Sequence, residues 1–383
     1  MSQKAPDSMR GETLFALGAE RIHALCRALG FSQAQEQRMV EVFATLSTSW
    51  GQLPAGSAPR WPSDITDDGT PFEFSLAIDG EEPELRFLIE AQTPESPTLA
   101  SNWFAGWALC ERLEREPGVS LERLRLIEDL FVPTAACPRF ALWHAVCFRK
   151  GRAPDFKVYL NPMAWGREQA HALVAEAMRR LGMAESVVCL PERTSRDVPV
   201  YFSLDLASRQ GARVKVYTEH REVTASRVES LLRQAPGYEP GQVEGFCRAM
   251  AGSQGPYVAR PVLTCLAFVE GSPLPSMGTV HFPVRTYAED DRAARDRILA
   301  FLRPEAAALY ARAISAFAAR PLEAGIGMQT YASLRQQRAQ RRLTVYLAPE
   351  VFAVRPAQPA LPPGVLEPEA VTPVRGGALH TRS

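Results

Sequence analysis

A short strand-like phrase that joins cations to tyrosines occurs twice in the sequence. The first copy is Lys157-Val158-Tyr159, and the second is Arg213-Val214-Lys215-Val216-Tyr217. Because successive side chains of a strand point to opposite faces, each copy places its cations and its tyrosine on one face and its valines on the other. The apolar face must be covered, and the other face must line a polar space. Such a polar face suits a ligand that has an anionic head and a cationic or apolar tail.

Other strand-like runs carry the same kinds of residue on the matching face. Arg86 and Arg335 bring the cations to five, which could together hold one strongly anionic group such as a diphosphate through charge-assisted hydrogen bonds. His281 and Tyr346 add two rings at the same two-residue spacing. An aromatic face stabilises a nearby cation by about 0.5–2 kcal/mol, and loss of diphosphate from an allylic carbon generates such a cation. One Lys-x-Tyr alone would indicate no more than an ordinary polar strand face, whereas the whole set indicates a site.

The elements that must position these residues alternate in pairs. We expect five hairpins, with strands at 72–79 and 84–91, 138–149 and 155–161, 198–206 and 212–219, 258–269 and 278–285, and 326–336 and 341–348. Helical patterns are expected at 10–30, 33–50, 102–115, 119–130, 166–183, 225–235, 240–251, 289–302 and 304–319. Ten antiparallel strands leave unpaired edges unless the sheet closes. The sequence therefore predicts an α+β fold, a ten-stranded antiparallel β-barrel surrounded by paired α-helices, with room for a chamber inside.

Composition limits the organisation of the chain. Because no Gly/Ser/Pro linker interrupts the alternation, we expect a single domain over residues 10–352. A flexible N-terminus at 1–9 and a Pro-rich, disordered tail at 353–383 would flank it. The seven cysteines form no CxxC pair, and neither an apolar leader nor a membrane-spanning stretch is present in the sequence. We therefore expect a cytoplasmic protein.

The charge balance bears on the class of partner. The chain has 43 basic and 43 acidic residues and no net charge, which disfavours binding to nucleic acid or to an anionic membrane surface. Alternating basic and aromatic strand residues can also form a platform for single-stranded nucleic acid, but that platform needs an exposed sheet and a basic domain. We expect no nucleic-acid and no membrane partner.

Four segments resemble the indole prenyltransferases of the dimethylallyltryptophan synthase type, in particular bacterial members. They are residues 70–75 (TPFEFS), 157–162 (KVYLNP), 213–217 (RVKVY) and 343–350 (LTVYLAPE), and the resemblance extends over roughly residues 10–352. It implies the same barrel and the transfer of a prenyl group from an allylic diphosphate to an aromatic acceptor, usually tryptophan or an indole-containing compound. Dimethylallyl diphosphate is the favoured donor, and the resemblance implies that no metal or other cofactor is required.

The resemblance also implies roles for individual residues. Glu73 would accept a hydrogen bond from the indole N–H, and His144 would stand where relatives place the lysine that removes the final proton. The diphosphate would be bound by Arg86, Lys157, Arg213, Lys215 and Arg335, and the allyl cation would be shielded by Tyr159, Tyr217, His281 and Tyr346. Apart from the resemblance, the bulk of two side chains leads us to predict that they narrow the acceptor or prenyl pocket: Trp143 and Met328, which precedes the strand segment of Tyr331.

Two alternatives stay open at this point. The acceptor could be a phenol, such as tyrosine or a polyketide, or the protein could carry an isoprenoid diphosphate without consuming it. Asp290, Asp291 and Asp296 superficially resemble the aspartate-rich magnesium motif of other prenyl-transfer enzymes. They stand at a predicted helix start, however, where acidic side chains cap amide groups and favour the helix dipole. We therefore predict a capping role for these aspartates.

Overall fold

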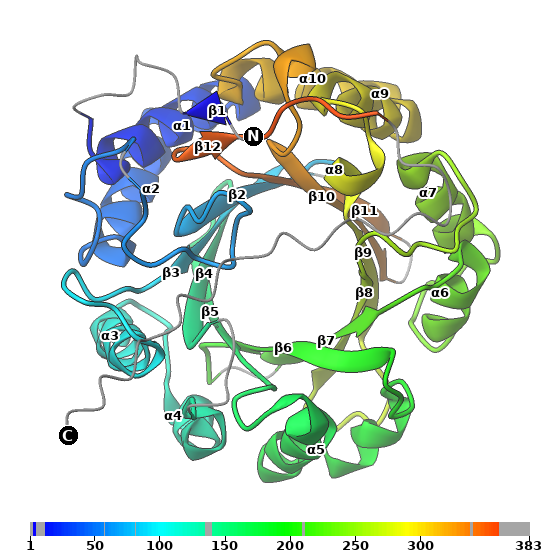
Figure 1. The fold of residues 1–383 in the computed structure, drawn as a ribbon. Coiled ribbons are helices and arrows are strands. Elements are labelled where there is room, and N and C mark those ends of the chain that lie inside the picture. Colours follow the sequence, from blue (N-terminus) through cyan, green and yellow to red (C-terminus); the bar gives the residue numbers. More distant parts are fainter. Residues whose placement is uncertain are drawn as a thin grey trace, which may run out of the picture.

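The computed structural model describes residues 3–4, 12–56, 58–80, 82–134, 140–208, 211–337 and 340–359. Ten strands form a closed antiparallel barrel, in the order β10-β11-β2-β3-β4-β5-β6-β7-β8-β9. Viewed along its axis, the barrel is ringed by helices (Figure 1). Closure pairs every barrel strand on both sides, which removes the edge problem that ten antiparallel strands pose. The fold predicted from the sequence is confirmed.

The barrel strands form five consecutive hairpins. Their bounds are β2 (Phe72–Ala77) and β3 (Glu84–Glu90), β4 (Leu142–Arg149) and β5 (Asp155–Leu160), β6 (Asp197–Asp205) and β7 (Arg213–His220), β8 (Val262–Val269) and β9 (Met277–Phe282), and β10 (Gln329–Gln337) and β11 (Gln340–Leu347). The predicted strand that runs to residue 285 ends at Phe282 instead, because Pro283 has no N–H to continue the ladder.

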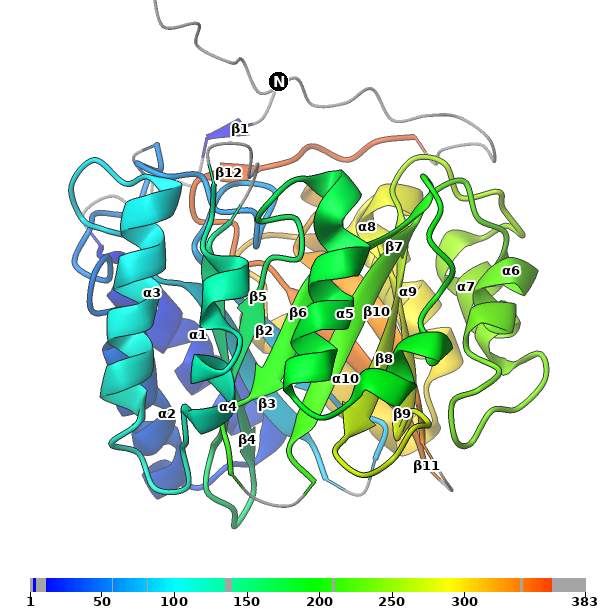
Figure 2. The same ribbon diagram turned by 90° about the horizontal axis from the view of Figure 1, so that it is seen from below.

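Helices cover the outside of the barrel between the hairpins (Figure 2). They are α1 (Leu14–Leu29), α2 (Gln33–Leu46), α3 (Leu99–Leu113), α4 (Glu122–Arg125), α5 (Ala170–Arg180), α6 (Ala225–Leu231), α7 (Gln242–Ala251), α8 (Val284–Tyr287), α9 (Asp291–Phe301) and α10 (Pro304–Phe317). The helix predicted at 119–130 is shorter than expected, since α4 has only one turn and a 3-10 turn at Glu128–Phe131 follows it. In the described part of the chain, no helix is long and apolar enough to cross a bilayer.

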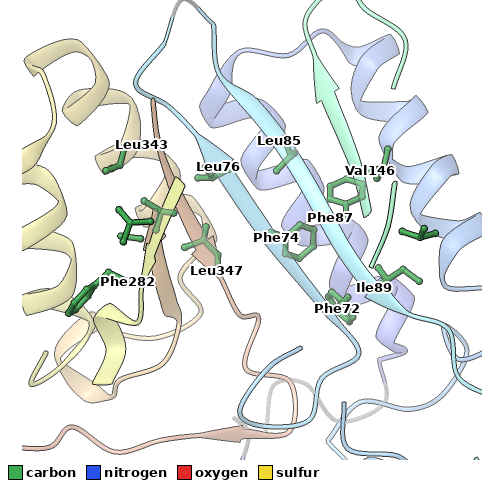
Figure 3. Close-up of a cluster of buried hydrophobic side chains, with 14 of the residues drawn as sticks. Phe72, Phe74, Leu76, Leu85, Phe87, Ile89, Val146, Phe282, Leu343 and Leu347 are labelled. Atoms are coloured by element: carbon green, nitrogen blue, oxygen red, sulfur yellow. The ribbon is translucent and has the colours of Figure 1, made fainter. Parts of the chain in front are cut away.

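The hydrophobic core lies between the outer face of the barrel and these helices. Strand β2 shows how the sequence builds it, because Phe72 and Phe74 face outwards (Figure 3). Phe72 stacks on Trp50 with 5.4 Å between ring centroids, and Phe74 packs edge-on against Phe317 of α10 at 5.7 Å. The alternation of the strand then forces Glu73 to the opposite face, inside the barrel.

The two ends of the domain lie together, and the domain extends past the boundary predicted at residue 352. Ala353–Val354 forms a short strand, β12, that pairs with β1 (Gln3–Lys4), and Figure 2 shows the pair at one end of the barrel. Gln358 donates from its backbone N–H to the carbonyl of Glu289 at 2.8 Å. The prediction of a disordered tail is therefore wrong for residues 353–359, because local composition carries no information about partners supplied by distant segments. Residues 360–383, and residues 1–9 apart from 3–4, lie outside the described residues.

Candidate active site

A chamber inside the barrel brings together ten of the thirteen predicted site residues. All five predicted cations line it, as do all four predicted rings and the carboxyl of Glu73. Each reaches the chamber because the alternation of its strand turns it inwards, and at least one of its neighbours in the strand packs in the outer core. The strand pattern therefore predicted where these side chains lie, and the roles assigned to them stay predictions.

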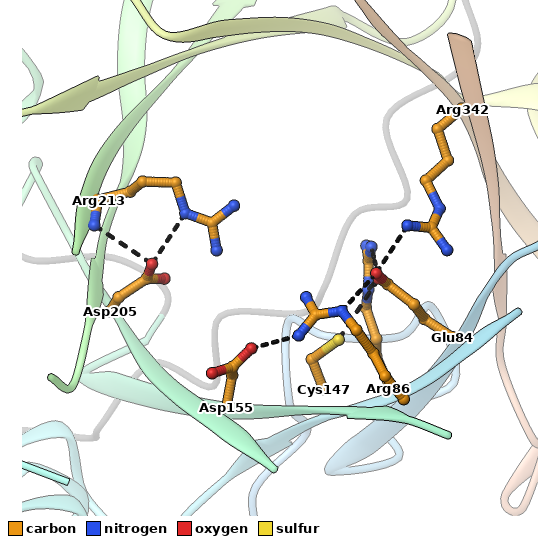
Figure 4. Close-up of polar contacts among 8 residues, drawn as sticks. Glu84, Arg86, Cys147, Asp155, Asp205, Arg213 and Arg342 are labelled. Atoms are coloured by element: carbon orange, nitrogen blue, oxygen red, sulfur yellow. Dashed lines mark hydrogen bonds and ion pairs between the residues drawn. The ribbon is translucent and has the colours of Figure 1, made fainter. Parts of the chain in front are cut away.

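One end of the chamber is strongly cationic. Glu84 lies among three arginines, accepting hydrogen bonds from Arg86 Nε at 3.0 Å and from Arg149 Nε and Arg342 Nη1 at 2.7 Å each. Figure 4 shows this group and, across the barrel, a second pair in which Arg213 donates through Nε to Asp205 at 2.9 Å. Because the cations outnumber the carboxylates that neutralise them, this end is suited to a polyanion.

The pKa values of the two lysines at this end reflect their burial and the excess of positive charge around them. Burial lowers the pKa of Lys157 and Lys215. For Lys215, the neighbouring Lys157 and Arg213 lower the pKa further, and Asp205 opposes them. A bound polyanion would relieve this repulsion, so its binding and the protonation of both lysines favour each other.

A belt of rings lies next to the cations. The ring of Tyr217 is 5.7 Å from that of Tyr159 and 5.4 Å from that of His281, and His281 is 5.7 Å from Tyr346. Burial lowers the pKa of His281 to about 3, and the positive charges of Lys215 and Arg86 add to the effect. His281 is therefore a neutral ring at physiological pH, and the belt presents four uncharged π systems to the chamber.

Glu73 is a buried carboxyl with one strong hydrogen bond. Only 6% of the residue is exposed, and Thr330 donates through Oγ1 to its Oε1 at 2.6 Å. Burial raises the pKa of Glu73 to about 7, although the Thr330 bond and the charge of Arg285 act in the other direction. A carboxyl with this pKa is a strong hydrogen-bond acceptor near neutral pH and can shift towards its ionised form when positive charge develops beside it.

Trp143 also lies inside the barrel, beyond the tyrosines. It stacks on Phe140 with 4.0 Å between ring centroids and packs against Tyr201 at 5.2 Å. These rings form a small apolar cluster against which Tyr159 also packs. The prediction that Trp143 narrows the pocket is consistent with this position and stays a prediction.

Two predicted site residues lie outside the barrel interior altogether. His144 is fully buried on the outer face of β4, where its Nε2 lies 3.2 Å from Cys110 Sγ of α3. The assignment of His144 as a base is wrong, since one step along the strand exchanges inside and outside. The prediction that Met328 narrows the pocket is wrong for a different reason. It precedes β10 and packs in the outer core near Phe317 and Glu350, not in the chamber.

Sequence reasoning missed a second polar group at the Glu73 end of the barrel. Arg260 and Arg285 both donate to the carboxylate of Asp67, and Arg260 also donates through Nε to the hydroxyl of Tyr331 at 3.2 Å. Strand alternation could not find them, because Asp67 is in a loop and Arg285 is in α8. One signal was available: Arg260 precedes β8 and Arg285 follows β9, and in a hairpin these two positions meet at one end.

The aspartates that resemble a magnesium motif have structural partners. Asp290 accepts a hydrogen bond from the backbone N–H of Ala293 at 2.7 Å and caps α9, as predicted. Asp291 is fully buried and accepts from the backbone N–H of Gln329 at 3.0 Å. Asp296 pairs with the neighbouring Arg295. Within the described ranges, no group of three or more His, Cys, Asp or Glu side chains could hold a metal ion.

Comparison with known proteins identifies the family. Residues 18–234, more than half of the chain, match the family described as tryptophan dimethylallyltransferase. The chain belongs to this family. Prenyltransferase PriB, solved as a ternary complex with L-tryptophan and dimethylallyl thiolodiphosphate, is 36% identical with a TM-score of 0.85, over 91% of this chain and 100% of that chain. The resemblance inferred from the sequence motifs is confirmed, and the protein is a prenyltransferase.

Two further members of the family are similar over the same extent. The 6-dimethylallyltryptophan synthase from Micromonospora olivasterospora, in complex with DMASPP and Trp, is 33% identical with a TM-score of 0.83, over 90% of this chain and 100% of that chain. The 5-dimethylallyltryptophan synthase from Streptomyces coelicolor is 34% identical with a TM-score of 0.83, over 90% and 99%. The names of these two relatives give different positions of the dimethylallyl group on tryptophan. Family membership by itself therefore leaves the position of attack open.

Proposed function

We propose that the protein transfers a dimethylallyl group from dimethylallyl diphosphate to the indole ring of L-tryptophan. The observation that carries the proposal is the order of groups along the chamber: clustered cations at one end, a belt of rings beside them, and the carboxyl of Glu73 towards the other end. The register of β2 gives this order, because Ala77 pairs with Glu84, Ser75 pairs with Tyr346, and Glu73 lies two residues further along the strand. The order matches the reactants, because a diphosphate, an allyl cation and an indole N–H need these three environments in this sequence. Relatives solved with tryptophan and a dimethylallyl diphosphate analogue support it.

In the first step, the bond between the allylic carbon and the diphosphate oxygen breaks, and its electron pair leaves with the diphosphate. Arg86, Arg213 and Arg335, together with Lys157 and Lys215, stabilise the negative charge that develops on the leaving group. Two of these side chains are held in place before the substrate arrives, since Glu84 already accepts a hydrogen bond from Arg86 and Asp205 accepts one from Arg213. Positioned charges of this kind lower the barrier without reorganisation during the reaction.

In the second step, the allyl cation lies against the rings and the indole attacks it. The faces of Tyr159, Tyr217 and Tyr346 stabilise the cation and exclude water that would otherwise capture it. Glu73 accepts the indole N–H hydrogen bond, which strengthens as positive charge spreads over the attacked ring. The proton of the alkylated carbon then passes to the diphosphate released in the first step or to water, and the electron pair of the C–H bond restores aromaticity. His144 is not in the chamber and takes no part in this step.

We also propose that the chemistry needs no metal ion and that the protein acts in the cytoplasm. Five side-chain cations can neutralise a diphosphate, which is the task that magnesium performs in sites rich in carboxylates. The six cysteines within the described residues are all free and buried, which is typical of proteins from a reducing compartment.

Product analysis tests the proposal against its alternatives. We expect incubation with dimethylallyl diphosphate and L-tryptophan to yield tryptophan that carries one dimethylallyl unit. A phenolic acceptor is favoured instead if tyrosine or a polyketide phenol is prenylated and no indole is. A carrier would bind dimethylallyl diphosphate and leave it intact with every acceptor. Absence of product across a broad panel of indoles and phenols, with allylic diphosphates of several lengths, would refute an enzymatic role.

A further inference from the structure

Two arginines outside the predicted site lie at the cationic end of the chamber. Arg149 is the last residue of β4 and lines the chamber, and Arg342 lies on β11. Both donate to Oε1 of Glu84 at 2.7 Å, Arg149 through Nε and Arg342 through Nη1 (Figure 4). Arg335 lies directly opposite Arg342 in the pairing of β10 with β11. We call Glu84, Arg149, Arg335 and Arg342 the rim cluster, because each lies close to the hairpin turn of its strand.

The described residues leave part of the rim cluster unsatisfied. Nε of Arg335 and Nε of Arg342 are both buried and have no hydrogen-bond partner among them. Like charges directly opposite each other also destabilise a strand pair. Burial, together with the charges of Arg86 and Arg342, lowers the pKa of Arg335 to about 10. Because buried charged donors without acceptors are costly, an anion that bonded these groups would stabilise the rim cluster.

The order of side chains along two strands sets the direction in which a prenyl donor lies. In β7, Tyr217 belongs to the belt of rings, and Lys215 shares its face two residues nearer the hairpin turn. Tyr159 and Lys157 repeat this order in β5. Two residues of a strand span about 6.6 Å, so the phosphate bonded to an allylic carbon on the rings lies beside these lysines. The second phosphate then extends away from the rings, towards the rim cluster.

We infer that the rim cluster binds the terminal phosphate of the prenyl donor, and that Arg149 and Arg342 thereby select a diphosphate over a monophosphate. The inference rests on the proposed function. Arginine presents its donors in a planar fork that matches phosphate oxygens, and Arg335 and Arg342 have buried donors to spare. Glu84 orients Arg149 and Arg342 before the donor binds. The phosphate next to the rings is held by the lysines in either kind of donor.

A purely structural role for the two arginines leads to a different expectation. Glu84 has 2% of its side chain exposed, and its ion pairs with Arg149 and Arg342 connect β3 to β4 and to β11. If neutralising Glu84 were their whole function, their loss would lower stability and would weaken every ligand of the chamber alike. Loss of a contact with the terminal phosphate would weaken only ligands that carry this phosphate.

The test compares two unreactive ligands that differ by one phosphate. Dissociation constants of dimethylallyl thiolodiphosphate and dimethylallyl thiolophosphate are measured by titration calorimetry without an acceptor. The variants are Arg149→Gln, Arg342→Gln and Arg342→Lys, with Lys157→Gln as the comparison beside the rings. Arg152→Gln is the control, since Arg152 is exposed between β4 and β5. Thermal unfolding reports whether each variant is folded, and Arg342→Lys keeps a positive charge beside Glu84 if Arg342→Gln does not fold.

We expect Arg149→Gln and Arg342→Gln to bind the thiolodiphosphate about 10- to 100-fold more weakly than the wild type, as for loss of a hydrogen bond to a charged group. Their affinity for the thiolophosphate should be unchanged. Arg342→Lys should lose less, because it keeps the charge without the fork. Lys157→Gln should weaken both ligands, and Arg152→Gln neither.

The inference is overturned if neither Arg149→Gln nor Arg342→Gln weakens the thiolodiphosphate selectively, whether both ligands are weakened by the same factor or both bind as before. A folded wild type that binds neither ligand would instead contradict the proposed function.

Discussion

The hydroxyl of Thr330 donates to Oε1 of Glu73 at 2.6 Å, across 257 positions of sequence. The two residues belong to β10 and β2, which are separated in the barrel by β11. The register of β10 shifts between Gln329 and Ala332, and Thr330 lies in this irregular stretch. The bond fixes one oxygen of Glu73, so that the carboxyl is oriented before an acceptor binds.

The first prediction concerns the pH dependence of turnover. Because burial raises the pKa of Glu73 to about 7, the carboxylate that accepts the indole N–H forms as pH rises through that value. We expect kcat/KM for the acceptor to rise along a limb with an apparent pKa of about 7, and the limb should disappear in Glu73→Gln. Glu90 is the matched control, since burial raises its pKa to about 7 as well. If Glu90→Gln removes the limb and Glu73→Gln does not, the assignment is wrong.

The same group makes a separate prediction about stability. A carboxyl whose pKa is raised from 4.5 to about 7 in the folded protein keeps its proton while the unfolded chain loses it. Its contribution to stability is therefore complete below pH 4.5 and is lost as pH rises towards 7. Glu73→Gln lacks this loss, so its Tm relative to the wild type should increase between pH 5 and pH 8. A difference in Tm that is constant over this range would contradict the raised pKa.

The third prediction is that the cations at one end of the chamber determine the affinity for the prenyl donor. Arg213→Gln removes a guanidinium that lines the chamber, and we expect the donor to bind about 10- to 100-fold more weakly, as for loss of a hydrogen bond to a charged group. Arg152→Gln, at an exposed position between β4 and β5, should leave the affinity unchanged. Titration with the non-hydrolysable thiolodiphosphate analogue measures both. Equal affinities for Arg213→Gln and the wild type would place the diphosphate elsewhere.

The fourth prediction concerns the effect of metal removal on turnover, because the aspartates at the start of α9 have structural partners. We expect turnover to persist in EDTA, because the charge of the diphosphate is met by side chains. Asp291→Asn should lower the free energy of unfolding by about 3 kcal/mol, since it breaks a buried pair with Arg320, without creating a requirement for magnesium. Turnover that is lost in EDTA, restored by magnesium and abolished by Asp290→Asn would show that these residues bind a metal after all.

How far the sequence predicted the site depends on how each residue is positioned. Lys215 and Tyr217 were placed correctly because strand alternation is a local property and flanking valines fix its phase. His144 failed for the same reason in reverse, because an error of one residue moves a side chain to the other face. Strand alternation did not place Arg285, since this residue lies in α8, after Pro283 has ended the strand. Partners that are distant in sequence, such as Thr330 for Glu73, follow from barrel closure and not from local pattern.

Mass analysis of the product made by the wild type and by Glu73→Gln tests the central claim most directly. Both proteins are incubated with dimethylallyl diphosphate and L-tryptophan in EDTA, after their folding has been checked by thermal unfolding. We predict that the wild type converts tryptophan to a product heavier by one dimethylallyl unit, and that Glu73→Gln does so about 10²- to 10⁴-fold more slowly, as for loss of a positioned acid–base group. A folded wild type that forms no prenylated tryptophan, or a Glu73→Gln variant as fast as the wild type, would contradict the account.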